Sequence, residues 1–352
     1  MEYMGKTMQE SMNNALINID DTMPNVEILE NEKMSEHCSF RIGGPVRAFI
    51  APKDIWDMTK VFYYLHMNNI YPFMLGKGTN ILIPDEGLDI CVVSTENLQD
   101  IRMGEEENTI YAEAGVSLAR LAQFAQQNGL AGLEFASGIP GSVGGGTLMN
   151  AGAYGGEMKD VVDSVVAYYL PEQALCEIKG EDCGFAYRHS NFEQAMCAIL
   201  SVVFKLTPDD PDAILARMNE MNDKRRKSQP LDLPSAGSAF KRPVGGYAAA
   251  LIEQSGLKGY TVGGAQVSEK HSGFVVNKGG ATYDDVVELL DNVRHKVYED
   301  TQITLEPEIR IYPKGMILVD DWRRRRENIM DEMSDYAKAK VEESKKEKET
   351  EE

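Results

Sequence analysis

Glycine is concentrated in one short segment of this chain. Residues 138–157, GIPGSVGGGTLMNAGAYGGE, contain eight glycines. Because glycine loses more backbone freedom on ordering than any other residue, we expect a loop here rather than a packed helix or strand. Without side chains, the backbone N–H groups can come close enough to surround a pyrophosphate. A tight crossover between strands is the alternative, but the interleaved donors Ser142, Thr147 and Asn150 favour a phosphate-binding loop.

The segment does not match the common nucleotide-binding motifs. Residues 144–149 lack the last glycine of GxGxxG, and the chain has no Walker A motif. A dinucleotide site would therefore belong to a fold other than the Rossmann type. A second loop, GKGTN at residues 76–80, is a weak candidate by itself, but together with the longer loop it would supply the second lip of a cleft.

Charge and cysteine content narrow the class of protein. A formal net charge of −20 argues against sequence-independent nucleic-acid binding, which depends on neutralising phosphates. No apolar run approaches the ~20 residues that a membrane-spanning helix needs, and the polar N-terminus lacks the apolar core of a secretory signal. The five cysteines are scattered, and no His or Cys cluster has metal-site spacing. We expect a cytoplasmic protein without a metal or a membrane segment.

Hydrophobic periodicity predicts a mixed α+β chain. The first thirty residues show no clear period and are expected to form a flexible or helical arm. Ser117 and Thr282 are expected to cap helices, and a linker containing Pro230 and Pro234 marks a domain boundary. Expected helices cover residues 54–68, 117–128, 212–227, 247–254 and 283–299, and expected strands cover residues 46–51, 71–75, 88–93, 109–112, 161–170, 198–206, 274–277 and 304–312.

Six sequence blocks follow one another along the chain. They are SFRIGGP at 39–45, GKGTNIL at 76–82, the glycine-rich segment at 138–157, YRHS at 187–190, PSAGSAFKRP at 234–243 and LEPEIR at 305–310. In this order they resemble the blocks of one enzyme family, the UDP-N-acetylenolpyruvoylglucosamine reductases (UDP-N-acetylmuramate dehydrogenases), and six ordered blocks are far more specific than any single motif. The spacing between Arg188 and Glu308 resembles the shorter branch of the family, which lacks a substrate-capping loop that carries a tyrosine.

The resemblance covers roughly residues 33–313 and implies an α+β fold. A FAD-binding module of the vanillyl-alcohol-oxidase (PCMH) type, built from two subdomains, would precede a substrate-binding α+β domain. The expected division is an N-terminal arm at 1–32, the FAD-binding domain at 33–227 with subdomains of about 33–85 and 86–227, the substrate-binding domain at 228–313 and a charged, solvated tail at 314–352.

The resemblance also implies a reaction. FAD would be bound and NADPH would be the co-substrate, because no protein side chain delivers a hydride. The substrate would be UDP-N-acetylglucosamine enolpyruvate, a UDP-linked enolpyruvyl amino sugar, which is reduced to UDP-N-acetylmuramate in peptidoglycan synthesis. We expect a monomer that acts on small molecules.

The matched blocks supply the expected site residues. By resemblance, Arg188 meets the charge that develops on the substrate carboxylate, Glu308 orients that carboxylate, and Ser238 protonates the carbon. Taken alone, they would be a surface arginine, a strand glutamate and a turn serine. Tyr154 and Lys241 are expected to bind the substrate. The expected FAD contacts are Arg41, Ile42, Gly43, Gly76, Lys77, Gly78, Thr79, Asn80, Gly138, Ile139, Gly141, Ser142, Gly144, Gly145, Asn150 and Ala151.

Two other functions are compatible with the residues. A FAD-dependent oxidase could use the same scaffold, although the glycine-rich region contains no His or Cys for covalent flavin attachment. A nucleotide-binding or assembly protein could keep the fold without activity and use the charged tail to bind a partner. A flavin that is bleached by NADPH and recolours with the enolpyruvyl sugar would separate the reductase from both.

Overall fold

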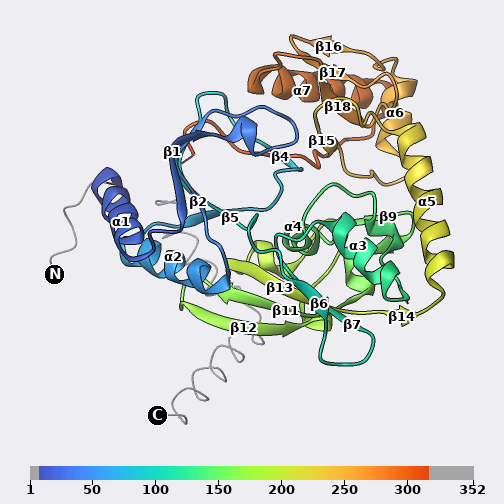
Figure 1. Cartoon of the computed structure of the whole chain (residues 1–352). Coiled ribbons are helices and arrows are strands. Elements are labelled where there is room, and N and C mark those ends of the chain that lie inside the picture. The colour runs from blue at the N-terminus through green and yellow to red at the C-terminus, as the bar shows by residue number, and fades with distance from the viewer. Residues whose placement is uncertain (1–7, 317–352) are drawn as a thin grey trace.

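The computed structural model describes residues 8–316, which form three main sheets with helices around them (Figure 1). The tail expected at 314–352 lies outside the described residues from position 317 onward. No helix in the described part of the chain is long and apolar enough to cross a membrane. The helices are α1 (Met8–Thr22), α2 (Ile55–Met67), α3 (Leu118–Gln127), α4 (Val143–Leu148), α5 (Pro211–Ser228), α6 (Ala248–Gln254) and α7 (Tyr283–Thr301).

The central strands of the first sheet, β2 (Pro45–Ala51) and β5 (Leu88–Ser94), are buried on both faces. The strands of this sheet lie in the order β1 (Glu27–Lys33), β2, β5 and β3 (Pro72–Leu75), with only the β1–β2 pair antiparallel. Side chains alternate between the two faces of a strand, so Phe49 and Val92 join one hydrophobic cluster while Ile50 and Val93 join the other. This sheet therefore joins two cores into one body.

Each core is completed by an antiparallel sheet. The first core contains the second sheet, β12 (Ala174–Lys179), β11 (Val162–Tyr169), β13 (Cys197–Lys205), β7 (Thr109–Glu113) and β6 (Ile101–Met103), in that order. The other contains the third sheet, β15 (Ser235–Ser238), β18 (Phe274–Asn277), β17 (Ala265–Val267) and β16 (Thr261–Val262), together with α6 and α7. Three small pairs complete the described strands: β9 (Gly152–Ala153) with β10 (Gly156–Glu157), β8 (Leu130–Ala131) with β14 (Thr207–Pro208), and β4 (Ile81–Leu82) with β19 (Arg310–Ile311).

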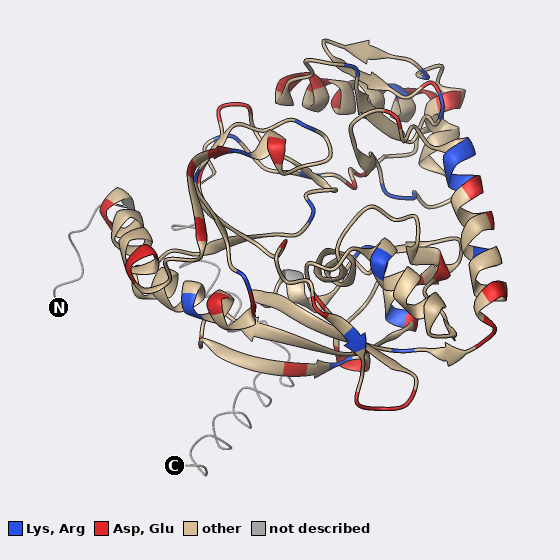
Figure 2. Ribbon diagram, in the orientation of Figure 1, with Lys and Arg blue, Asp and Glu red and all other residues tan. Residues whose placement is uncertain are grey.

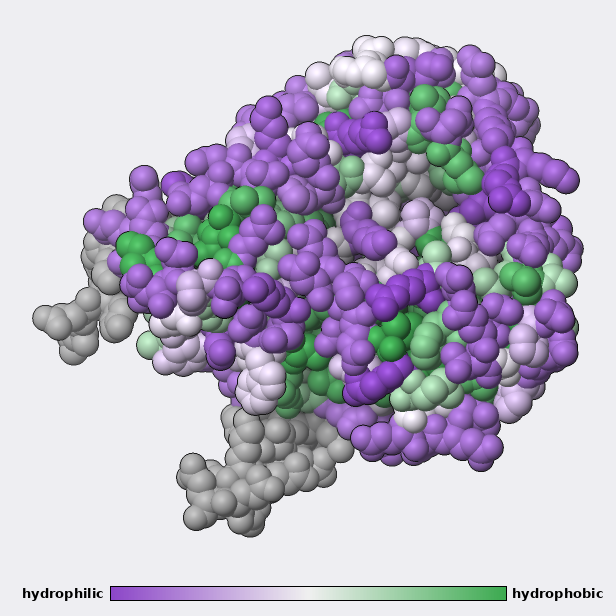
Figure 3. Space-filling model, viewed as in Figure 1, coloured by the Kyte–Doolittle hydropathy of each residue, from purple (hydrophilic) through white to green (hydrophobic). Residues whose placement is uncertain are grey.

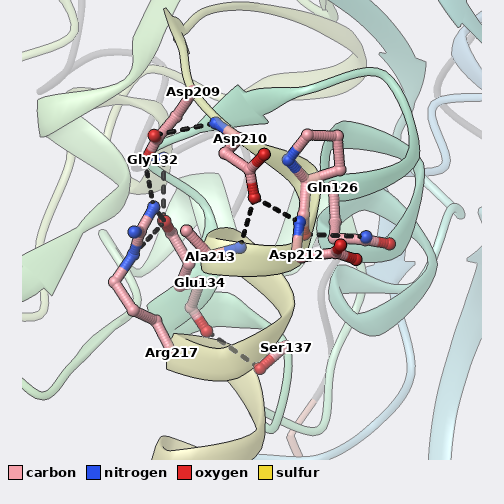
Figure 4. A network of polar contacts seen from close by, with 10 residues as sticks. Gln126, Gly132, Glu134, Ser137, Asp209, Asp210, Asp212, Ala213 and Arg217 are labelled. Carbon is pink, nitrogen blue, oxygen red and sulfur yellow. Dashed lines mark hydrogen bonds and ion pairs between the residues drawn. The ribbon is translucent and has the colours of Figure 1, made fainter.

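Helix α5 runs from the second sheet to the third sheet, along the right edge of Figure 1. A polar network fixes its first turns (Figure 4). The Arg217 guanidinium donates to Glu134 Oε1 from Nε at 2.9 Å and from Nη2 at 2.7 Å, and Nη2 also lies 2.6 Å from Asp209 Oδ2. The Asp210 carboxylate caps the helix by accepting from the N–H groups of residues 212 and 213. The start of α5 is thus tied to the segment just before the glycine-rich residues.

The predicted helix caps are confirmed. Ser117 Oγ accepts from the Arg120 N–H, and Thr282 forms a reciprocal capping box with Asp285. The arm is helical at α1, where Met12, Leu16 and Ile19 are buried. Its last residues pair with β2 as an edge strand that the sequence analysis did not predict. Charged residues along β1 hide the alternation there, as is common in edge strands.

Two expected elements were wrong. The glycine-rich segment contains the helix α4, which Ser142 caps by accepting from the Gly145 N–H. Glycine is needed there for packing, because a Cβ on Gly144 would lie only 2.8 Å from the Ala114 Cβ. The strand expected at 304–312 is reduced to β19 and one bridge at Pro307, since proline has no N–H to donate to a ladder.

Candidate active site

A cavity of about 290 Å³ lies where the two glycine loops meet the third sheet. Its lining includes residues of the 76–80 loop, of the glycine-rich segment, of β15 and of the segment that leads into β19. The face shown in Figure 3 is mostly hydrophilic, with hydrophobic side chains in separate patches. The predicted residues that line the cavity are Gly76, Lys77, Gly78, Thr79, Asn80, Ile139, Gly141, Ser142, Gly145, Ala151, Arg188, Ser238 and Glu308.

The two glycine loops pack directly against each other. A Cβ on Gly76 would lie 2.7 Å from Ser142 Oγ, so only glycine allows this approach. Gly78 has a φ of +57°, and a Cβ there would lie 2.2 Å from the carbonyl oxygen of His37. Where the two loops meet, the lining is therefore backbone and small side chains, as close approach of a pyrophosphate requires, whereas elsewhere it includes large side chains such as Phe274 and Tyr312. No Cys or His is among the lining residues, so the cavity offers none of the usual residues for covalent flavin attachment.

Several predicted cofactor residues do not line this cavity. Arg41 is exposed with a φ of +57°, while Ile42 and Gly43 are buried. Gly138 contacts α5, since a Cβ on it would lie 2.3 Å from Asn222 Oδ1. Gly144 packs against Ala114, the residue that follows β7. None of these residues is part of the cavity lining.

Asn150, also outside the lining, holds the turn that carries Arg188. Its Nδ2 donates to the Ala186 carbonyl at 3.0 Å and to Glu157 Oε2 at 2.6 Å. Ala186 and His189 close a two-residue turn through two backbone hydrogen bonds, with Arg188 at a φ of +54°. A non-glycine residue in the left-handed region is strained, and such strain is common at functional sites. The turn directs Arg188 into the cavity.

Arg188 and Glu308 form an ion pair across the cavity. Arg188 Nε lies 2.5 Å from Glu308 Oε1. The two residues are 120 positions apart in the sequence and lie near different sheets. Their side chains are 23% and 12% exposed. Asn80 Nδ2 donates to the Glu308 carbonyl at 3.2 Å, and the Glu308 N–H donates to the carbonyl of Ala239. Glu308 is therefore held by both the 76–80 loop and the third sheet.

Burial dominates the electrostatics of Glu308. It raises the pKa of this carboxyl, because the charged form loses solvation, and this effect outweighs the opposing attraction of Arg188 and Lys241. The Glu308 carboxyl is consequently easier to protonate than an ordinary glutamate. It can act as a hydrogen-bond donor toward a bound carboxylate.

Ser238 lies at the end of β15, beside a register shift in the β15–β18 pairing. The preceding Gly237 has a φ of +76°, which turns the chain at this point. Within the described residues, no hydrogen bond occupies Ser238 Oγ. Its hydroxyl is thus available to a ligand in the cavity that Arg188 and Glu308 also line.

The two expected substrate-binding residues lie outside the lining. Lys241 Nζ forms an ion pair with Glu306, and Tyr154 is 45% exposed with its ring near Arg225. The sequence analysis missed Arg225, Gln229 and Arg310, which do line the cavity. Arg225 stands in a run of basic residues at the end of α5, and this run alone does not show which member faces inward.

Two family models match the parts of the chain that meet at the cavity, and they define a class of protein, the flavin-binding oxidoreductases. Residues 46–170 match the model of the FAD binding domain. Residues 229–312 match the model described as the C-terminal domain of UDP-N-acetylenolpyruvoylglucosamine reductase. The fold is α+β, with the FAD-binding module expected from the sequence followed by this C-terminal domain.

Relatives along most of the chain specify the family. The reductase of that name from Syntrophomonas wolfei is 44% identical over 294 residues, which is 83% of this chain and 97% of the relative. The one from Clostridium botulinum is 40% identical over 298 residues, 85% of this chain and 96% of the relative. The crystal structure of UDP-N-acetylenolpyruvylglucosamine reductase from Thermus caldophilus is 32% identical, covers 82% of this chain and 99% of that one, and has a TM-score of 0.69.

This chain belongs to the UDP-N-acetylenolpyruvoylglucosamine reductases, the FAD-containing oxidoreductases of peptidoglycan precursor synthesis. The resemblance seen in the six sequence blocks is confirmed.

Proposed function

We propose that this protein reduces UDP-N-acetylglucosamine enolpyruvate to UDP-N-acetylmuramate, with NADPH as the electron donor and bound FAD as the carrier, in the cytoplasm and as a monomer. The observation that carries the proposal is the meeting of Arg188, Glu308 and Ser238 at one cavity beside two glycine loops. Membership of the reductase family supports the substrate class. The division of the chain at residues 1–32, 33–227, 228–313 and 314–352 is part of the same proposal.

The glycine loops suit FAD. Close contact between residues 76 and 142 leaves backbone amides rather than side chains at the cavity surface, which fits a pyrophosphate. Lys77 and Thr79 line the same wall and can contact the cofactor. When bound there, FAD supplies the two-electron chemistry that no side chain provides.

Arg188 is placed to hold the carboxylate of the enolpyruvyl group. Addition of a hydride to the vinyl CH₂ carbon leaves negative charge on the adjacent carbon and on the carboxylate. A planar guanidinium matches a carboxylate with two parallel hydrogen bonds, which stabilise that charge as it grows. The substrate carboxylate then replaces Glu308 as the partner of Arg188, and a protonated Glu308 can donate a hydrogen bond to it.

Ser238 is placed to give the proton that completes the reduction. A serine hydroxyl is a weak acid, so it can serve only where the acceptor carbon is strongly basic, as an enolate carbon is. Proton donation at such a carbon contributes typically about 100- to 10,000-fold to rate. The hydroxyl regains its proton from solvent after the product leaves.

An anaerobic titration of the purified protein tests the function. The protein should be yellow, its flavin absorbance should be lost with NADPH, and the absorbance should return on addition of UDP-N-acetylglucosamine enolpyruvate without oxygen. Recovery only on admission of oxygen would instead indicate an oxidase. A colourless protein that binds the UDP-sugar but no flavin would indicate a binding module.

A further inference from the structure

Helix α2 has a second apolar face that is not part of the core. Its buried side chains belong to the first hydrophobic core. On the opposite side of the helix, the side chains of Trp56, Tyr63 and Met67 are 75%, 48% and 49% exposed. These three residues stand at i, i+7 and i+11, so at 3.6 residues per turn they form one line, which we call the α2 stripe. Large apolar side chains that are aligned on one exposed helix face indicate an interaction surface.

A second stripe with the same spacing is encoded beyond the described residues. The sequence places Trp322, Ile329 and Met333 at i, i+7 and i+11, and the other apolar residues of the segment 322–337, at positions 330, 336 and 337, fall on the same side of a helical projection. We call residues 322–337 the tail segment. A helix of this length is marginal in water by itself, so its apolar face needs a partner. Residues 342–352 are all polar or charged and are not part of this segment.

Charge on the arm complements the tail segment. Four consecutive arginines, Arg323–Arg326, follow Trp322 directly. Helix α1 lies beside α2 (Figure 1), and the residues of α1 and β1, within 8–33, include one lysine and six acidic residues, which are red in Figure 2. A tail segment on α2 would therefore bring its arginines close to carboxylates of opposite charge. The acidic residues are Glu10, Asp20, Asp21, Glu27, Glu30 and Glu32.

The described chain ends within reach of α2. Tyr312 packs its ring against that of Phe73, with centroids 4.9 Å apart. Phe73 follows Met67 by six residues, so the end of α2 lies within about 22 Å of this contact. Trp322 follows Tyr312 by ten residues, which span up to about 33 Å when extended. The tail segment can therefore reach the α2 stripe of its own chain.

We propose that the α2 stripe is the docking surface for the tail segment, residues 322–337, of the same chain. The two stripes cover the same length, about 16 Å at 1.5 Å per residue, so their large side chains can pack along one helix–helix contact. Docking removes both apolar faces from water together. No residue of α2 lines the cavity, so the inference goes beyond the proposed function and does not depend on it.

The two tryptophans of the chain, Trp56 and Trp322, make the contact measurable. Trp322→Phe keeps an apolar ring in the tail segment and leaves Trp56 as the only tryptophan. In this full-length holoenzyme, the emission maximum of Trp56 and its quenching by acrylamide report whether the α2 stripe is covered. Docking predicts blue-shifted emission and weak quenching, although the described part of the chain leaves the Trp56 side chain 75% exposed.

Met333→Asp, introduced into Trp322→Phe, places a carboxylate on the apolar face of the tail segment and should release it. The emission of Trp56 should then shift to longer wavelength, and its quenching by acrylamide should increase. Ser334→Asp in the same background is the matched control, because it adds the same carboxylate one residue later, on the polar face of the helical projection. It should leave both signals unchanged. The variants are compared at equal flavin content, because bound flavin absorbs tryptophan emission.

A double-mutant cycle in the melting temperature tests whether the two stripes touch. Trp56→Ala and Met333→Asp should each lower the melting temperature of the full chain. The double variant should melt no lower than the more affected single variant, because either substitution already breaks the shared contact. Trp56→Ala combined with Ser334→Asp is the reference pair. Additive losses from Trp56→Ala and Met333→Asp would overturn the proposal.

The fluorescence also separates the other possible occupants of the α2 stripe. Equal quenching of Trp56 in Trp322→Phe and in its Met333→Asp derivative would mean that the tail segment does not cover the stripe, which would then be free for another protein. Shielding that disappears on dilution, together with a dimer in sedimentation, would assign the stripe to a second copy of the chain. Either result would overturn the proposal. Shielding that is independent of protein concentration and is lost with Met333→Asp supports docking within one chain.

Discussion

Arg188 combines a strained backbone with a single well-defined polar contact, and both features suggest that its position matters more than its charge. A φ of +54° is unfavourable for a non-glycine residue. The hydrogen bonds of Asn150 and of the Ala186–His189 backbone pair hold Arg188 in this conformation. The fork of the guanidinium, not a point charge, fits the two oxygens of a carboxylate.

Arg188→Lys should therefore fold and keep its flavin, yet turn over slowly. Lysine keeps the positive charge and bears the same backbone cost, but it cannot make the two-point contact. Loss of one preorganised donor of this kind typically lowers kcat roughly 100- to 1000-fold. Steady-state kinetics with flavin content as the control checks this, and near-normal kcat would make Arg188 only an ion-pair residue.

Glu308 gives the site a dependence on pH. Burial raises the pKa of this carboxyl, so on acidification it takes up a proton earlier than an ordinary glutamate does. An ionised Glu308 competes with the substrate carboxylate for Arg188, and a protonated one does not. The KM for the enolpyruvyl sugar should therefore fall as the pH is lowered from about 8 toward the raised pKa.

Glu308→Gln should remove that trend, because the amide does not titrate. Its KM should be nearly constant over the same pH range, whatever happens to kcat. KM for NADPH, measured in parallel, serves as the reference for general pH effects on binding. If parent and variant show the same slope of KM with pH, Glu308 does not control access to Arg188.

At the scale of elements, α5 is the structural link between the site and the fold. The Glu134 carboxylate is 10% exposed and accepts hydrogen bonds from Arg217 and from the Gly132 N–H (Figure 4). These bonds tie the first turns of α5 to the segment just before the glycine-rich residues. The opposite end of the same helix carries Arg225 and leads into Gln229 at the cavity. A shift of the helix would displace both.

Arg217→Ala should destabilise the protein by about 1–3 kcal/mol, because it leaves a mostly buried carboxylate without its cation. In the same variant, the KM for NADPH or for the UDP-sugar should rise. Lys296→Ala, which breaks the exposed pair with Asp300, should cost far less stability, because solvent screens a surface ion pair. Chemical denaturation of both variants provides the comparison. Equal small losses would mean that the Arg217 network adds nothing beyond a surface ion pair.

Local chemistry made the helix starts predictable from the sequence. Ser117 and Thr282 mark helix starts because their hydroxyls satisfy free N–H groups at those positions. Helix α4 was not predictable in the same way, because its glycines are required by close contacts with Ala114 and Leu118, which are distant in sequence. Arg225 was missed for a similar reason, since only the tertiary fold distinguishes it from its exposed neighbours.

At the scale of the whole molecule, the site is formed where the third sheet meets the two glycine loops. Ser39 Oγ donates to the Ser235 carbonyl at 2.6 Å, and Asn277 Nδ2 donates to the Phe40 carbonyl at 3.2 Å. With the contact between Asn80 and Glu308, these bonds hold β15 over the glycine loops. Arg188 reaches the cavity from the segment between β12 and β13, whereas Ser238 and Glu308 lie within residues 229–312, which match the C-terminal domain model.

The central claim is that these two parts of the chain form one active site in which Ser238 serves only the second half-reaction. Stopped-flow absorbance of the flavin in Ser238→Ala tests it most directly. Reduction of the flavin by NADPH needs no proton from serine, so its rate should stay close to that of the parent protein. Reoxidation by UDP-N-acetylglucosamine enolpyruvate should slow by about 100-fold or more, and Ser238→Cys should recover part of the rate because a thiol is the stronger acid. Unchanged reoxidation, or equal slowing of both half-reactions, would contradict the account.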